Sequence, residues 1–303
     1  MFVLNDDMRD FVKKKIGFKS GLRVLDVGCG SGEFIWYLAK DSSGVDFTGL
    51  DYDESFVEAA TKRIPGEHEC SFSFVQGDAK EMPFPDECFD LVVSHTFFNS
   101  MPQYKEALSE MIRVCKPGGI IASVSSMDVA HIPYFKGIYP ESANAWKKEY
   151  DMLLEKVQKM YEKVTPIQGL LQGIATELIP AFFARNGLDE VSAYPIGRFF
   201  SLSNSATPQD KKKRYIELDY ISEKKRVECV YELDEAKECM SGEEVKRFIE
   251  LLEVRRDYLL KNINENRTWE LQGGVSLLVT GRRLSRDQAF LHGILNSGLF
   301  GVK

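Results

Sequence analysis

The chain has 303 residues, of which 44% are hydrophobic and 28% charged, a balance typical of a folded globular protein and not of a disordered or fibrous one. Lysine and arginine number 39 against 46 aspartate and glutamate, so the formal net charge is -7. This negative charge disfavours general binding to the phosphate backbone of nucleic acids. The length allows one or two domains.

The first residues, Met1 to Asp10, lack the basic start and the apolar run of a signal peptide. No apolar stretch approaches the roughly 18 residues that a membrane span needs, so we expect a cytoplasmic protein without a membrane span. The six cysteines are widely spaced and form no C-x-x-C pair. They are predicted to be free thiols that serve as small apolar residues, the alternative being a redox or arsenic-binding role for three of them.

Residues 22–126 alternate short apolar runs with amphipathic segments, which is typical of a parallel sheet whose strands are joined by helices. A Pro-Gly-Gly sequence at 117–119 predicts a turn before the last strand of this region. The pattern indicates an α/β fold with a doubly wound sheet. Strands are expected at 23–27, 47–51, 72–76, 89–94 and 119–124, and helices near 34–40, 56–62 and 104–114.

The second half of the chain has a coarser pattern. Helices are expected over about 143–163 and 170–185, with Gly187 at a helix C-cap and a strand near 191–196. Residues 207–267 are dense in nearly balanced charge and lack strand alternation, so they are predicted to be helical, with a capping box at 241–244. A last apolar strand is expected at 275–280, before an unpatterned tail at 286–303.

The most informative segment joins the first expected strand to the first expected helix, where Asp26 is followed by glycines at 28, 30 and 32. A dinucleotide-binding turn requires G-x-G-x-x-G, and its third glycine position is here Glu33. Two acidic residues beside the turn, Asp26 and Glu33, would repel a pyrophosphate. An NAD-dependent dehydrogenase is therefore a weaker alternative, and a cationic ligand without phosphate fits better.

The stretch from Asp26 to Gly32 resembles the first motif of the class I S-adenosylmethionine-dependent methyltransferases, in particular the ubiquinone/menaquinone-type, small-molecule branch. Further segments resemble that family's motifs in the same order along residues 22–126. An aspartate at a strand end is more often a helix cap or turn former, so the order and spacing of the segments carry the assignment. The further segments are Gly49 to Asp53, Gln76 to Ala79, Phe84 to Val92 and Arg113 to Gly119.

The resemblance implies S-adenosyl-L-methionine as the cofactor, with no metal. The ribose hydroxyls would donate to Asp51, and Tyr52 would cover the adenine. Asp78 would accept from the exocyclic amine, and the backbone N–H of Ala79 would meet the ring. The remaining expected cofactor contacts are Asp26, Gly28, Cys29, Gly30, Gly32 and Ser94.

The resemblance also implies a Rossmann-like sheet of seven strands, mostly parallel with the last strand antiparallel. The strands near 191–196 and 275–280 would form the antiparallel edge pair, with the helical segment 207–267 inserted between them. The Rossmann-like domain would then comprise residues 1–206, including an N-terminal helix, and 268–285. The insertion is expected to be either a substrate lid or a packing or dimerisation element.

The acceptor side is expected at the carboxyl ends of the fourth and fifth strands, where open α/β sheets bind their ligands. His95 is the first candidate for a general base, because an ordinary histidine pKa of about 6.5 suits accepting a proton at neutral pH. The alternative is that His95 only packs beside the cofactor or bonds to backbone. His131 and Tyr134 are the next candidates, and nearby aromatics such as Phe97 and Phe98 are candidate walls of an apolar acceptor pocket.

The implied activity is in-line methyl transfer to an O or N nucleophile of a small-molecule metabolite. The fourth strand is not followed by the Asn/Asp-Pro-Pro-Tyr/Phe motif of enzymes that methylate adenine or glutamine amides, which disfavours nucleic acid as a partner. The alternatives are a methyltransferase that acts on a peptide or protein and a non-catalytic cofactor-binding partner protein. The basic runs at 211–214 and 224–226 are interpreted as solvated helix faces, although the first offers a contact for an anionic acceptor.

Overall fold

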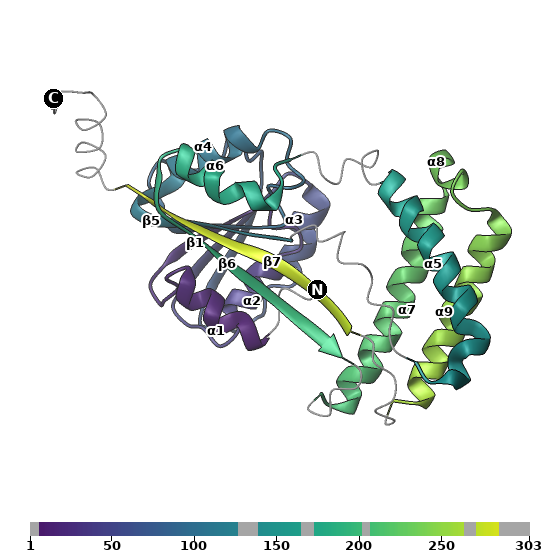
Figure 1. The fold of residues 1–303 in the computed structure, drawn as a ribbon. Helices are drawn as coiled ribbons and strands as arrows, with labels where there is room; N and C mark the ends of the chain where they lie inside the picture. The colour runs from purple at the N-terminus through teal and green to yellow at the C-terminus, as the bar shows by residue number, and fades with distance from the viewer. Residues whose placement is uncertain (1–5, 127–138, 165–172, 202–206, 264–270, 285–303) are drawn as a thin grey trace, which may run out of the picture. The chain divides into compact units, whose positions relative to one another are not determined.

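A computed structural model describes residues 6–126, 139–164, 173–201, 207–263 and 271–284 of the chain (Figure 1). These residues fold into two compact units. The first contains the described residues of Met1–Asp128, Leu171–Gly197 and Gly274–Lys303, and the second those of Val129–Leu170 and Arg198–Gly273. Among the described helices, none combines the length and the apolar character needed to cross a bilayer.

The first unit contains a seven-stranded sheet in the order β3-β2-β1-β4-β5-β7-β6. Strands β1 to β5 pair in parallel, and β7 runs antiparallel to β5. The expected Rossmann-like, mostly parallel sheet is therefore confirmed. The strands are β1 (Arg23–Val27), β2 (Asp46–Asp51), β3 (Ser71–Gln76), β4 (Phe89–His95), β5 (Cys115–Ser126), β6 (Leu188–Ser201) and β7 (Leu271–Arg283).

Helices cover both faces of this sheet (Figure 1). Residues of α4 (Tyr104–Val114) and α6 (Ile179–Arg185) share one buried cluster, whereas residues of α1 (Asp6–Lys15) and α2 (Glu33–Ala39) share the other. Neighbouring residues of one strand enter opposite clusters, as Val24 and Leu25 do in β1. The central strands are thus buried on both faces, which is why they appear in the sequence as continuous apolar runs. The remaining helix of this unit, α3 (Glu54–Thr61), follows β2.

Several element boundaries differ from the prediction. Strand β5 begins directly after α4, and the predicted turn is a bulge within it: Phe89 pairs with Cys115 but Leu91 pairs with Ile120, and Gly118 has a φ of +79°. The helix expected over 170–185 is described only as α6, because Pro180 belongs to the first turn of a helix and not to its interior. Gly187 follows α6 with a φ of +83°, as expected at a helix C-terminus.

The second unit is a helical bundle of α5 (Asn144–Val164), α7 (Gln209–Tyr231), α8 (Asp234–Lys237) and α9 (Gly242–Lys261). Helix α9 begins at the predicted capping box, in which Ser241 and Glu244 bond to each other's backbone. The sequence analysis placed α5 in the Rossmann-like domain, and the structure places it in this bundle. The reason is its apolar stripe, which packs on α9 and includes a stacked pair between Tyr150 and Phe248 at 5.5 Å.

The bundle core also holds a buried ion pair. The Arg255 guanidinium donates to the Asp219 carboxylate at 2.8 Å, and only 7% of the Arg255 side chain is exposed. One helical turn from Asp219, Glu223 accepts a hydrogen bond from the Tyr161 hydroxyl at 3.1 Å. Burial raises the pKa of the Glu223 carboxyl. The charges of α7 are thus partly inside the bundle, so the helix is more than a solvated surface element.

Candidate functional site

A pocket of about 570 Å³ opens at the carboxyl ends of β1, β2, β3 and β4, and all of its walls belong to the first unit. This edge is where the strand order reverses between β1 and β4, the position at which open α/β sheets bind ligands. The lining residues are Gly28, Gly30, Leu50, Asp51, Tyr52, Phe56, Gly77, Asp78, Ala79, Lys80, His95, Thr96, Phe97, Ser100, Met101 and Gln103.

The glycine turn after β1 forms one wall of the pocket. Gly28 has a φ of +70°, and a Cβ atom built on it would lie 2.5 Å from Cδ2 of Phe97. Gly30 also has a positive φ, of +53°, but a Cβ atom on it would meet no atom of the described residues within 4 Å. Packing against Phe97 therefore requires a glycine at position 28. At position 30 the absence of a side chain instead leaves the backbone uncovered at the pocket.

Asp51, at the end of β2, joins that strand to the glycine turn. Its carboxylate accepts from the backbone N–H of Gly30 at 2.7 Å and from that of Asp53 at 3.0 Å. The backbone N–H of Gly77, after β3, in turn donates to the Asp51 carbonyl at 2.9 Å. These bonds hold the Asp51 side chain at the pocket wall, between the turns that follow β1 and β3.

Asp26 is the last but one residue of β1 and is only 1% exposed. Within the described part of the chain, neither of its carboxylate oxygens has a hydrogen-bond partner. Burial, and next the charge of Asp51, raise the pKa of this carboxyl well above its ordinary value. Burying a carboxyl without a hydrogen-bond partner costs folding free energy in the ligand-free protein. Its position next to the glycine turn favours a ligand that carries positive charge.

Another part of the pocket wall follows β3. The Asp78 carboxylate accepts from the backbone N–H of Lys80 at 2.9 Å and lies 3.3 Å from the Lys80 ammonium. Two aromatic side chains at the pocket are largely exposed, Tyr52 at 77% and Phe56 at 48%. Exposed aromatic rings beside a carboxylate suit a flat ligand ring that carries a hydrogen-bond donor.

Four predicted cofactor residues do not line the pocket: the buried Asp26, and Cys29, Gly32 and Ser94. Cys29 is buried against the sheet, where its Sγ would be 2.8 Å from a Cβ atom on Gly49, and burial raises the pKa of its thiol. Gly32 precedes α2, where a Cβ atom would lie 2.8 Å from Nε1 of Trp36. Ser94 is fully buried, because it alternates along β4 with His95, which faces the pocket.

His95 lines the pocket and stacks on Phe34, with 5.6 Å between the ring centroids. Its Nε2 is buried and has no hydrogen-bond partner among the residues described. Burial lowers the pKa of His95 to about 4, so the ring is neutral near pH 7. The next residue, Thr96, has a φ of +52°, which turns the chain sharply as it leaves β4.

The remaining acceptor-side candidates are divided. His131 and Tyr134 lie outside the described residues. Phe97 lines the pocket, whereas Phe98 is fully buried in the core against Phe182 and Phe183. The sequence analysis missed pocket residues that follow strand ends and carry no motif, although the strand-end rule pointed to this region. They are Phe56, Lys80, Ser100, Met101 and Gln103, whereas Leu50 and Gly77 lie inside motif segments that gave them no role and Thr96 lies in the expected acceptor-side region after β4.

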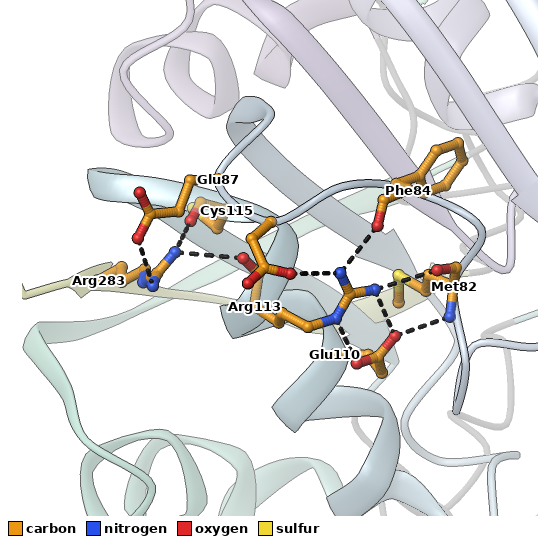
Figure 2. Close-up of polar contacts among 8 residues, drawn as sticks. Met82, Phe84, Glu87, Glu110, Arg113, Cys115 and Arg283 are labelled. Carbon is orange, nitrogen blue, oxygen red and sulfur yellow. Dashed lines mark hydrogen bonds and ion pairs between the residues drawn. The ribbon is translucent and has the colours of Figure 1, made fainter.

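The loop between β3 and β4 is held by an arginine that the sequence analysis left without a role (Figure 2). Arg113, on α4, forms a two-pronged ion pair with Glu110 at 2.6 and 2.7 Å. The same guanidinium donates to the Phe84 carbonyl and to Asp86, both at 2.8 Å, and to the Met82 carbonyl at 3.0 Å. Arg113 therefore bonds directly to the other motif segment, Phe84 to Val92, so that this segment and the segment Arg113 to Gly119 are held together.

Comparison with known proteins agrees with this geometry. Residues 25–123 match the family model described as a methyltransferase domain. The chain is 33% identical over 156 residues to a demethylmenaquinone methyltransferase of Staphylococcus aureus, a match that covers 51% of this chain and 63% of that enzyme. The chain thus spans less than two thirds of the length of that relative.

Solved structures show the same fold at lower identity. The YcgJ protein from Bacillus subtilis is 18% identical, with a TM-score of 0.50 and coverage of 93% of this chain and 100% of that one. The [4+2]-cyclase SpnF is 17% identical, also with a TM-score of 0.50, and coverage is 92% of this chain and 81% of that one. Together with the glycine turn and the order of the sheet, the family match shows that residues 25–123 form a methyltransferase domain.

Proposed function

We propose that the pocket binds S-adenosyl-L-methionine and that the protein transfers its methyl group to an oxygen or nitrogen of a small-molecule acceptor. The observation that carries this proposal is that one pocket collects the glycine turn, Asp51 and Asp78. Their order along the pocket suits the methionine, ribose and adenine parts of that cofactor. Gly30 leaves bare backbone beside the methionine part, and the Gly30 N–H already holds the Asp51 carboxylate in place for the ribose hydroxyls.

The adenine end of the pocket supports the same ligand. Asp78 offers a carboxylate for the exocyclic amine, and Ala79 lies beside it in the wall. Tyr52 and Phe56 offer exposed rings that would cover the purine and lose their own contact with water. Asp26, buried and unpartnered among the described residues, stands next to the glycine turn, and the positive charges of the cofactor would favour its ionised form.

When bound, S-adenosylmethionine supplies an electrophilic methyl carbon on a sulfonium, whose sulfur keeps the bonding electron pair when the methyl group leaves. The pocket walls align the acceptor for in-line attack and exclude water. Neutral His95 has an unshared electron pair on a buried nitrogen at the pocket, so it can accept the proton that the acceptor loses. Because burial makes His95 a weak base, its contribution is greatest while the attacking atom is acquiring positive charge.

A small-molecule acceptor is supported by the relative named demethylmenaquinone methyltransferase. Fold likeness alone does not establish methyl transfer, since a structure of the same fold is named as a cyclase. The other candidate activities are methylation of a peptide or protein, with the helical unit gripping the chain, and cofactor binding without turnover.

The test is calorimetric titration of the protein with S-adenosylhomocysteine, with NAD as the competing ligand. We expect micromolar binding of the first ligand alone. Asp51→Ala should weaken it at least about tenfold, because hydrogen bonds to a charged group are worth about 1.5–3 kcal/mol. Asp46→Ala is the matched control, since Asp46 stands at the other end of β2 and bonds to Ser71. Binding unchanged by Asp51→Ala would contradict the ribose assignment.

The acceptor class is tested next. The protein and radiolabelled S-adenosylmethionine are incubated with a panel of small-molecule hydroxyls and amines and with a panel of peptides. Label in the small molecules supports the proposal, and label only in peptides favours the alternative. Cofactor binding without label in either panel would favour the non-catalytic partner protein.

A further inference from the structure

We propose that Arg113 is a positioning residue for cofactor recognition: it fixes the loop after β3 so that Asp78 and Ala79 select adenine over other purines. This inference rests on the proposed function, because it assumes that the pocket binds an adenosine. It goes further by assigning the selectivity to a side chain that does not line the pocket.

Arg113 binds the loop at three separate points. Its guanidinium donates to the carbonyls of Met82 and Phe84 and to the carboxylate of Asp86 (Figure 2). Its ion-pair partner Glu110 accepts from the backbone N–H of Met82 at 2.7 Å. Both backbone polar groups of Met82 are therefore held by the two side chains of one helical turn of α4.

The contacts at Met82 continue directly into the pocket wall. The backbone N–H of Glu81 donates to the Asp78 carbonyl at 3.0 Å, which closes a turn between the pocket residues and Met82. Met82 and Ala79 are both buried in the same apolar cluster as Leu50. A shift of Met82 would thus move Ala79, and with it the backbone N–H and carboxylate that would meet the adenine.

The far end of the loop is held by a residue of β7, which lies between β5 and β6 in the sheet. Arg283, on β7, donates to the Glu87 carboxylate at 3.1 Å and to the carbonyls of Arg113 and Cys115. The loop between β3 and β4 is therefore fixed by α4, β5 and β7 together, before any ligand binds. Preorganisation of this kind lowers the entropy that a ligand must remove on binding.

Only an arginine can make these contacts. Four of its acceptors, the two Glu110 oxygens and the Met82 and Phe84 carbonyls, lie around one planar fork. The hydrogen bonds and charge of Arg113 lower the pKa of the Glu110 carboxyl, so the pair stays ionised at neutral pH. A lysine would keep the charge but has a single nitrogen, and could satisfy only part of this set.

The test is Arg113→Lys in the full chain, with two ligands: S-adenosylhomocysteine and S-inosylhomocysteine, which carries a carbonyl oxygen in place of the exocyclic amine. We expect wild type to prefer the adenosyl ligand, and Arg113→Lys to lose about tenfold in that affinity and most of the preference. Arg282→Lys is the matched control. Arg282 binds Glu190 at 2.7 Å and the Gly118 carbonyl at 2.8 Å, away from the loop.

A lower melting temperature of Arg113→Lys with unchanged ligand preference would show a purely structural role and overturn the inference. If Arg113→Lys does not fold, Asp86→Asn replaces it, because this exposed partner can be removed with little loss of stability. We expect Asp86→Asn to shift the preference in the same direction but less, and an unshifted preference would count against the inference.

A ligand-free measurement separates this inference from the proposed function. Hydrogen exchange should show a protected Met82 amide in wild type and in Arg282→Lys, and faster exchange in Arg113→Lys. Wild-type protein that binds no S-adenosylhomocysteine would refute the proposed function. Adenine selection by the loop would fall with it, whereas an equal Met82 exchange rate in wild type and Arg113→Lys would refute the positioning by Arg113 even in a protein that binds the ligand.

Discussion

Asp26→Asn should make the ligand-free protein more stable and its cofactor binding weaker. Asp26 is buried, and its two oxygens have no hydrogen-bond partner among the described residues. Burying a charged group without a hydrogen-bond partner costs about 1–3 kcal/mol or more of folding free energy. Asparagine has nearly the same shape but no charge, so the variant avoids the part of this cost that is due to the charge. We expect a gain of about 1–2 kcal/mol, which corresponds to about 2–8 °C in melting temperature for a domain of this size.

The sign of the pH dependence follows from the raised pKa of the folded carboxyl. Below about pH 4 the carboxyl is protonated in both the folded and the unfolded state, so it carries no penalty. As the pH rises towards the folded pKa, the unfolded state releases its proton first, and the wild-type protein loses stability. The advantage of Asp26→Asn should therefore grow with pH above about 4 and level off above the folded pKa.

The assay is thermal unfolding of both proteins from pH 4 to pH 9, followed by calorimetric titration with S-adenosylmethionine at pH 8. Asp90→Asn is the control, since Asp90 on neighbouring β4 is bonded to Lys116 at 2.7 Å and its loss should lower stability. Binding should weaken about tenfold in Asp26→Asn. A melting temperature equal to or below that of wild type at pH 8 would refute the reasoning about the unpaired carboxyl, and unchanged affinity would remove Asp26 from the site.

Three more predictions concern separate parts of the molecule. Gly28→Ala should lower the melting temperature more than Gly30→Ala, because both glycines have a positive φ but only a Cβ atom on Gly28 would collide with Phe97. Gly30→Ala should mainly reduce the affinity for S-adenosylhomocysteine. Equal melting temperatures of the two variants would contradict this prediction. His95→Gln should reduce turnover about 100-fold with little change in cofactor affinity. Because the folded pKa of His95 is about 4, wild type should lose stability as the pH falls from about 6.5 towards 4, by up to about 1.4 kcal/mol per unit, and the variant should lose less. Asp219→Ala should lower the free energy of unfolding, measured with a chemical denaturant, by about 3 kcal/mol, because it leaves Arg255 buried without this partner. Glu250→Ala removes an exposed partner of Arg247 and should lower it by under about 1 kcal/mol. Similar losses in the two variants would show that burial of the first pair is unimportant.

The sequence predicted the parallel half of the fold well, because those strands are buried on both faces. In β4, for example, the apolar residues Leu91, Val92 and Val93 follow one another directly. Gly28, Gly30, Asp51 and Asp78 were assigned through the resemblance to family motifs, and all four line the pocket.

The remaining features depend on tertiary partners that a single sequence does not reveal. The apolar stripe of α5 could pack equally well on the sheet or in a helical bundle. In the structure it packs in the bundle, where Tyr150 stacks on Phe248 of α9. Cys29 belongs to a cofactor motif, yet its side chain points into the core because Gly49 on the next strand leaves room there. Arg113 was quoted as part of a motif, but its role required the loop between β3 and β4 to come within reach of its guanidinium.

The helical unit is assembled from two stretches of chain that are far apart in sequence, and this determines how the protein can be re-engineered. Deleting residues 207–267 alone would leave α5 behind with the apolar side chains of Leu153, Val157 and Met160 newly exposed to water. Such a truncated protein should aggregate, and its loss of activity would say nothing about a lid. A graft that exchanges the unit between related enzymes must therefore carry both stretches and cut at all four crossings between the units.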